Sequence, residues 1–174
     1  MRARSSLGPV VAVVAATLAV AALACTPSAA RPAPAAPMAD PDVAAIEAVL
    51  AEFGRAIVAH DGDAIAALLL TPDAPFRWRR VDTGATGGFP GSSFASDVAG
   101  GSGWEERFAD VAITPRDGLA ILDSRYAFLE QGVQTNHGRE IWTLVQTAAG
   151  WRIASVTWSI VVDPAPADPA SGAR

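Results

Sequence analysis

Side chains that could carry out acid–base or covalent chemistry are few in this 174-residue chain. The sequence contains two histidines, one tyrosine and one cysteine, and all 13 of its lysine and arginine positions are arginine. The lack of lysine excludes a Walker-type phosphate loop, a Schiff-base lysine and a lysine general base. Acid–base chemistry in this chain would therefore depend on histidine, tyrosine or a carboxylate.

Two of these side chains lie in segments whose pattern indicates a place near an apolar interior. His60 follows an apolar stripe of helical spacing that includes Ile57, and it could contact a ligand at a cavity mouth or act as a base. The alternative is a histidine that favours the helix dipole and bonds a free carbonyl at the helix end. Tyr126 could donate a hydrogen bond to a ligand carbonyl from the wall of an apolar cavity.

The carboxylates of interest are Asp123 and Glu140, each in a segment with strand character. Asp123 shares a strand face with Arg125. If buried, Asp123 is a candidate general base with a raised pKa, and if exposed the two form an ion pair of little value. Glu140 shares a face with Trp142, and these two could line a pocket. In the alternative they are framework, with Glu140 paired to Arg139 or Arg125.

Other classes of site are disfavoured by spacing and charge. No His, Cys, Asp and Glu residues have the local spacing of a metal site, and the glycines within 84–91 lack the strand-to-helix setting of a phosphate loop. We therefore expect no metal and no cofactor. Removal of Arg2 and Arg4 with a leader leaves 11 arginines against 18 acidic residues, a net charge of −7. This charge argues against nucleic acid or an anionic membrane surface as partner.

Residues 1–25 have the pattern of a signal peptide. Arg2 and Arg4 precede an apolar run over 10–23 that is shorter than a membrane-spanning helix. The run ends in Ala-Leu-Ala-Cys at Cys25, which fits ordinary signal peptidase and also resembles a bacterial lipobox, whose cysteine is acylated. We therefore expect an exported protein, either soluble in the periplasm or anchored to the membrane by lipid on Cys25.

The composition divides the rest of the chain into a linker, one domain and a tail. Residues 26–40 are rich in proline and alanine and 163–174 read as a disordered tail, which leaves a folded domain over 41–162. Apolar residues at helical spacing predict helices over 43–57 and 65–69. Strands are predicted over 76–81, 108–114, 119–129, 137–147 and 151–162, with a Gly/Ser-rich loop over 82–103 that holds a short helix at 93–98.

The last forty residues carry the strongest pattern, two β-rich arms joined at Gly150. The first arm reads Gly-Arg-Glu-Ile-Trp-Thr-Leu-Val from Gly138, and the second reads Gly-Trp-Arg-Ile-Ala-Ser-Val-Thr-Trp-Ser from Gly150. They resemble the end of the nuclear transport factor 2-like superfamily, in particular its small SnoaL-like and ketosteroid-isomerase-like bacterial members. The resemblance implies an α+β cone, a curled antiparallel sheet with a packed N-terminal helical layer and an internal cavity. The isomerases take a catalytic tyrosine from the first helix, where this chain has none, so their catalytic set does not carry over.

The expected function follows from this cavity. We expect an exported, non-catalytic domain that holds a small hydrophobic molecule, or a dimeric scaffold. The alternative is a cofactor-free isomerase, cyclase or dehydratase that uses a cavity acid or histidine. The candidate cavity residues are His60, Tyr126, Glu140, Trp142 and Asp123.

The last strand also bears on assembly. Strict alternation puts Trp151 and Ile153 on one face of the strand and Val156 and Trp158 on the other. Both faces would then be too apolar for one of them to be fully solvated, and an exposed apolar sheet face usually marks an interface. We therefore expect a homodimer formed through the sheet.

Overall fold

Helix α1 (Pro41–Ala59) begins where the sequence provides a cap. The Asp40 side chain accepts a hydrogen bond from the backbone N–H of Asp42, and Pro41 occupies the first helical turn, where no backbone donor is needed. The computed structural model describes residues 40–163. The expected signal peptide, Cys25, the linker before Asp40 and the tail after Asp163 lie outside the described residues. In the described part, no helix is both long and apolar enough to cross a membrane.

The end of α1 and the start of α2 (Gly62–Leu68) form one tight break. His60 takes the left-handed conformation at φ 56° and its backbone N–H bonds back to the last turn of α1. The Asp61 side chain then caps α2 by accepting from the Ala64 N–H at 2.9 Å. This break turns the chain so that α2 packs beside α1 under the sheet.

The segment expected as a loop contains regular structure. Strand β1 (Pro75–Arg80) is followed by an antiparallel strand β2 (Thr86–Pro90) and then by helix α3 (Gly91–Gly100). The short helix predicted at 93–98 is confirmed by α3. The loop prediction was wrong for β2, because glycine there permits a close strand contact. A Cβ on Gly87 would lie 2.3 Å from the Trp78 ring, so only glycine lets β2 lie flat across that indole.

The last four strands are β3 (Trp104–Arg116), β4 (Leu119–Glu130), β5 (Val133–Thr147) and β6 (Gly150–Val162). They are joined by short turns and pair antiparallel, as the sequence predicted, and the whole sheet has the order β2-β1-β6-β5-β4-β3. The expectation of a wholly antiparallel sheet was wrong, because β1 lies parallel to β6 with Phe76 beside Val156. No turn joins these two strands, so tertiary packing sets their direction.

Strand β6 departs from strict alternation. Leu144 of β5 is opposite Ile153, whereas Thr143 is opposite Ser155, so Ala154 is an extra residue in β6. The bulge turns both Ile153 and Val156 toward the helices, where each is buried. The predicted separation of these residues onto opposite faces was therefore wrong.

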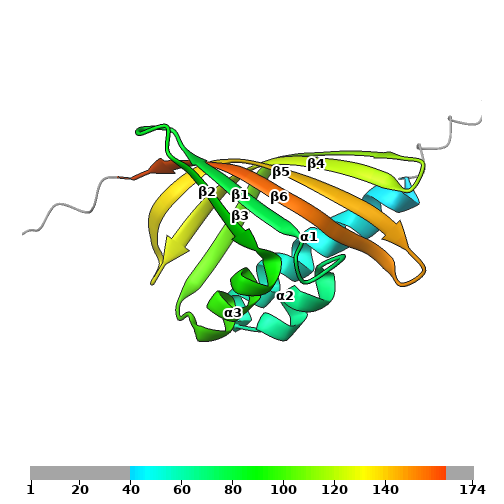
Figure 1. Ribbon diagram of the computed structural model, residues 1–174, viewed down its shortest axis with the longest axis horizontal. Coiled ribbons are helices and arrows are strands. Elements are labelled where there is room, and N and C mark those ends of the chain that lie inside the picture. Colours follow the sequence, from blue (N-terminus) through cyan, green and yellow to red (C-terminus); the bar gives the residue numbers. More distant parts are fainter. Residues whose placement is uncertain (1–39, 164–174) are drawn as a thin grey trace, which may run out of the picture. The chain divides into compact units, whose positions relative to one another are not determined.

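The architecture is an α+β cone, as predicted. Figure 1 shows α1, α2 and α3 gathered against the concave side of the curled sheet. The core lies between these layers and includes Ile46, Phe53, Ile57, Ile65, Leu122, Trp142, Leu144 and Ile153. The sheet is not closed, so its open end leaves space between the strands and the helices.

Candidate ligand cavity

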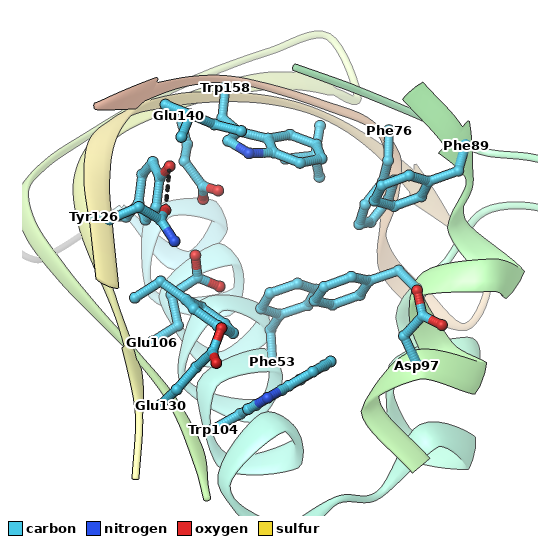
Figure 2. A pocket seen from close by; sticks show the side chains of 15 residues that line it. Phe53, Phe76, Phe89, Asp97, Trp104, Glu106, Tyr126, Glu130, Glu140 and Trp158 are labelled. Carbon is cyan, nitrogen blue, oxygen red and sulfur yellow. Dashed lines mark hydrogen bonds between the residues drawn. The ribbon is translucent and has the colours of Figure 1, made fainter. Parts of the chain in front are cut away.

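A cavity of about 290 Å³ lies between the concave face of the sheet and helices α1 and α3 (Figure 2). An apolar cavity of about 150 Å³ holds benzene. The space in this protein is therefore suited to a molecule of one or two rings. Most of its wall is aromatic, from side chains of Phe53, Phe76, Phe89, Phe94, Trp104, Tyr126, Phe128 and Trp158.

The aromatic rings pack against one another and hold the wall in place. Phe53 stacks on Phe94 with centroids 5.5 Å apart, and Phe89 meets Trp158 edge to face at 5.8 Å. Trp104 meets Phe128 in the same way at 5.6 Å. Such arrangements are favoured by the ring quadrupoles. The cavity is thus bounded by groups that support each other before any ligand arrives.

Two glutamates enter this aromatic space from neighbouring parts of the sheet. Glu140 of β5 is only 5% exposed, and its Oε2 accepts a hydrogen bond of 2.8 Å from the indole N–H of the fully buried Trp142. Glu106 of β3 is half-buried. Figure 2 shows both carboxyl groups directed into the cavity, toward each other.

The surroundings of these two carboxyl groups favour their neutral forms. Burial raises the pKa of Glu140 to about 7, although the hydrogen bond from Trp142 opposes the rise. Burial, followed by the charge of Glu140, holds the pKa of Glu106 well above its usual range. Two carboxylates that share an apolar site do not both ionise easily, so near neutral pH the pair holds a proton between them.

Tyr126 lines the cavity, but its hydroxyl group is engaged by the protein. Its Oη lies 2.9 Å from Asn136 Oδ1 and donates to the Ser159 carbonyl oxygen at 3.0 Å. Burial, and then the charges of Glu140 and Glu106, raise the pKa of the phenol. Tyr126 is therefore a neutral wall residue whose single proton is held by protein acceptors.

The arginines beside the cavity residues face the other way. Arg107, Arg125 and Arg139 directly neighbour Glu106, Tyr126 and Glu140 in sequence, and alternation turns them to the outer face of the sheet. There Arg125 pairs with Asp110 at 2.8 Å and Arg139 with Asp123 at 2.6 Å, while Arg107 pairs with Glu105. Among the described residues, none of those that line the cavity is an arginine or a histidine.

The structure brings together some of the residues that the sequence indicated. Tyr126 and Glu140 both line the cavity, and Trp142 lies behind Glu140 as a core residue. Asp123 lies on the outer face, paired with Arg139. His60 lies at the end of α1, where its Nε2 accepts from the Gly103 N–H at 3.3 Å, outside the cavity lining.

Sequence reasoning missed Glu106, the partner of Glu140. The predicted loop ended at Gly103 and the predicted strand began at Phe108, so Glu106 was left between them, whereas β3 begins at Trp104. The alternation of Trp104, Glu106 and Phe108 was the signal that could have found it. Asn136 and the rim acids Asp97 and Glu130 were also missed.

Among residues 40–163 there is no group of three His, Cys, Asp or Glu side chains that could hold a metal ion. The lining itself offers carboxyl groups in an aromatic enclosure.

Comparison with known proteins supports the fold. No family model matches the chain, and no curated protein matches it. Among solved structures, it is similar to an NTF2-like protein with a cystatin-like fold from Novosphingobium aromaticivorans. That match has a TM-score of 0.55 and 18% identity, and covers 71% of this chain and 84% of the other.

Two further structures carry suggested activities. A candidate dehydratase of the NTF2-like family from Streptomyces avermitilis matches with a TM-score of 0.57 and 18% identity, over 70% of this chain and 97% of the other. A candidate aromatic ring hydroxylase from Novosphingobium aromaticivorans matches with a TM-score of 0.54 and 19% identity, over 70% and 90%. The described domain has the nuclear transport factor 2-like fold, as the sequence predicted.

Proposed function

We propose that this domain binds a small molecule of one or two rings in its cavity and that Glu106 and Glu140 transfer a proton on it without a cofactor. The reaction class would be isomerisation or dehydration. The observation that carries this proposal is the placement of a 5%-exposed glutamate beside a second carboxyl group in an aromatic enclosure. Ionisable groups with strongly perturbed pKa values in a cavity are typical of acid–base sites.

The shared proton gives the pair two complementary roles. The ionised carboxylate takes a proton from a ligand carbon, and the neutral carboxyl group donates its proton to another position of the ligand. In an isomerisation the second position is another carbon, and in a dehydration it is a hydroxyl group that leaves as water. The pair ends each reaction with the same number of protons, so no external acid or base is consumed.

A second candidate is binding without catalysis, as a carrier or sensor of a hydrophobic molecule. The hydrogen bonds of Tyr126 favour binding without catalysis. The proton of its hydroxyl group is already held by Ser159 and Asn136 and is not offered to a ligand. Oxyanions that form during proton abstraction are usually stabilised by preorganised donors. Without the phenol, that stabilisation would rest on the neutral carboxyl group of the pair.

The ring opening of 5-nitrobenzisoxazole separates the two candidates. This bicyclic probe needs only a base near its C–H, and the N–O bond then breaks to give a coloured phenolate. We expect a rate above buffer that rises with pH through about 7, as the pair ionises. The rate should fall at least tenfold in Glu140→Gln and in Glu106→Gln, in line with the typical value of a general base.

Glu105→Gln is the matched control, because Glu105 neighbours Glu106 but pairs with Arg107 outside the cavity. It should leave the rate unchanged. If all three variants had the same rate as the unsubstituted protein, catalysis by the pair would be rejected. If the probe still raised the melting temperature of the unsubstituted protein in that case, binding without catalysis would be the better account.

Export and lipidation are part of the same proposal, supported by the leader sequence alone. Residues 1–24 would be removed by signal peptidase action, and Cys25 would carry lipid at the new N-terminus. Mass spectrometry of the N-terminal peptide from a bacterial host tests this point. An unmodified Cys25 in a soluble periplasmic fraction would reject the lipid anchor.

We also propose that the domain forms a homodimer through the outer face of the sheet. The bulge leaves Ser155 and Thr157 on the outer side of β6, so the last strand no longer supports this idea. The remaining support is an exposed apolar group on β4 and β5, where Leu119 is 56%, Ile121 54% and Ile141 38% exposed. Light scattering should report a dimer that Ile121→Asp converts to a monomer, and a monomer without substitution at tens of micromolar would contradict it.

A further inference from the structure

The charges of this domain are sorted between its surface and its cavity. Every arginine–carboxylate pair within residues 40–163 lies away from the cavity lining. The four carboxyl groups that do line the cavity have no cationic partner among the described residues. They are Asp97, Glu106, Glu130 and Glu140.

These four groups form a graded series from the rim to the interior. Asp97 on α3 and Glu130 at the end of β4 are exposed, Glu106 is half-buried, and Glu140 is almost fully buried. Figure 2 shows them around one space, among the rings of Phe53, Trp104 and Trp158. In the described residues, Glu140 Oε1 makes no hydrogen bond, although Oε2 receives one from Trp142. Glu140 is more than nine-tenths buried as a residue, and this oxygen of its carboxyl group is free toward the cavity.

We infer that the natural ligand is a lipophilic organic cation, a ring system that carries an ammonium group. The inference rests on the cavity being the ligand site proposed above, and it specifies the chemical class. Carboxylates can accept charge-assisted hydrogen bonds from an ammonium group. Aromatic faces attract the same cation through the ring quadrupole, most effectively where water is excluded.

Electrostatics disfavour the other two ligand charges. An anion would meet four carboxyl groups and no arginine or histidine in the lining. A neutral ligand would bury the inner pair further from water and supply no countercharge, which is costly for a carboxylate. An ammonium group supplies that countercharge. The exposed Asp97 and Glu130 would also raise the local concentration of cations at the mouth.

Binding of a cation should favour the ionised forms of the inner pair, so part of the bound population should lose the shared proton while the rest keeps it for the proposed transfer. The titratable groups that line the cavity with Glu140 are Glu106 of β3, Tyr126 and Glu130 of β4 and Asp97 of α3, whereas the lining residues from α1 and β6 carry no titratable group. A cation between Glu106 and Glu140 reduces the repulsion that keeps one of them neutral. Affinity should therefore rise with pH through the range in which the pair ionises.

The test is calorimetric titration of the purified protein with three ligands of the same ring: 2-phenylethylamine, 2-phenylethanol and phenylacetate. We expect the amine to bind about tenfold or more tightly than the alcohol, consistent with a charge-assisted pair. Phenylacetate should bind most weakly. At pH 6.5 the measured heat for the amine should depend on the ionisation enthalpy of the buffer, because a proton is released.

Variants identify the groups responsible. Glu106→Gln and Glu140→Gln should each remove most of the preference for the amine over the alcohol, and Glu105→Gln should leave it unchanged. If either inner variant fails to fold, Glu130→Gln at the exposed rim serves as the second test, with an expected loss of a few fold. Retention of the full preference in the folded variants would overturn the inference.

The outcomes separate this inference from the proposed function. Equal or tighter binding of the alcohol would overturn the cation class and leave the cavity as a site for neutral molecules. Failure of all three ligands to bind would also overturn it. The reaction of neutral 5-nitrobenzisoxazole does not depend on ligand charge, so its rate decides the proton-transfer proposal independently.

Discussion

The two faces of the sheet are built from the same strands but surround their carboxyl groups differently. Those on the outer face are paired with arginine, and those that line the cavity are not. On the outer face Asp123 has an arginine partner at 2.6 Å, and the side chains of Asp123 and Arg139 are 28% and 59% exposed. On the inner face Glu140, in the same sheet, has only an indole N–H and a second carboxyl group. Arg139 and Glu140 are adjacent in sequence, so the alternation of side chains along β5 places them on opposite faces of the sheet. This alternation alone keeps the arginine out of the cavity.

The largest expected contrast is in packing. Trp142→Ala removes a fully buried side chain that contacts Phe53 and supports Glu140, and should lower the free energy of unfolding by about 3–5 kcal/mol. Ile141→Ala, its neighbour on the outer face, should cost about 1 kcal/mol or less. Urea denaturation of both variants measures this contrast. Equal losses would show that the outer face is also packed against something.

The next contrast is the pH dependence of stability. The folded-state pKa of Glu140 is raised to about 7, so between pH 5 and 7 the folded state holds more protons than the unfolded chain. The free energy of unfolding should therefore fall as pH rises through this range. Glu140→Gln removes the titrating group and keeps an oxygen for Trp142. At pH 8 it should be more stable than the unsubstituted protein by roughly 2–3 kcal/mol.

The outer face supplies the control for this pH effect. Arg107 lowers the pKa of Glu105, so its contribution has the opposite sign and is lost as pH falls. Glu105→Gln should leave the slope between pH 5 and 8 unchanged. If the free energy of unfolding of Glu140→Gln changed with pH as steeply as that of the unsubstituted protein, Glu140 would not be the group responsible.

A smaller effect is expected for the phenol of the cavity wall. Tyr126→Phe removes the hydrogen bond to the Ser159 carbonyl and leaves that acceptor and Asn136 without it. The cost should be about 1–2 kcal/mol, measured by denaturant titration. The rate with 5-nitrobenzisoxazole should change by less than about threefold, because the phenol proton is not offered to the ligand. A large fall in rate would return Tyr126 to a direct role.

The smallest effect is expected for the outer ion pair. In the monomer, Asp123→Asn should lower the melting temperature by less than about 3 °C, because the Arg139 side chain of this pair is 59% exposed to the solvent that screens it. Differential scanning calorimetry at low and high salt measures it. If the proposed dimer covers this face, the loss should become larger and insensitive to salt as the protein concentration is raised.

The sequence predicted the fold chiefly through local rules. The arms around Gly150 form a hairpin as their composition indicated, and α1 begins after Asp40 with proline in its first turn. The direction of β1 could not be read in this way, because no turn joins it to β6. The flat contact of β2 on Trp78 depends on the absence of a side chain, which has no hydrophobic pattern.

Part of the candidate site could also be predicted from local sequence patterns. Glu140 was found because Trp142, on the same face, indicated the interior. Glu106 precedes a segment of β3 that is interrupted by a bulge between Ala109 and Ala112, which obscures the alternation of that strand. His60 and Asp123 attracted attention by residue type, but the helix end and the strand register direct them elsewhere. The type of a residue alone does not show which way its side chain points.

The bulge at Ala154 gives β6 one residue more than its pairing with β5 requires. A substitution at this small, half-buried position should have little effect, because its side chain is not part of the core. Deletion of Ala154 would remove the extra residue and leave Trp151, Ile153, Val156 and Trp158 in strict alternation on the inner face. The strand should therefore tolerate the loss of this one residue, whereas the loss of a second residue beside it would turn one half of the strand over.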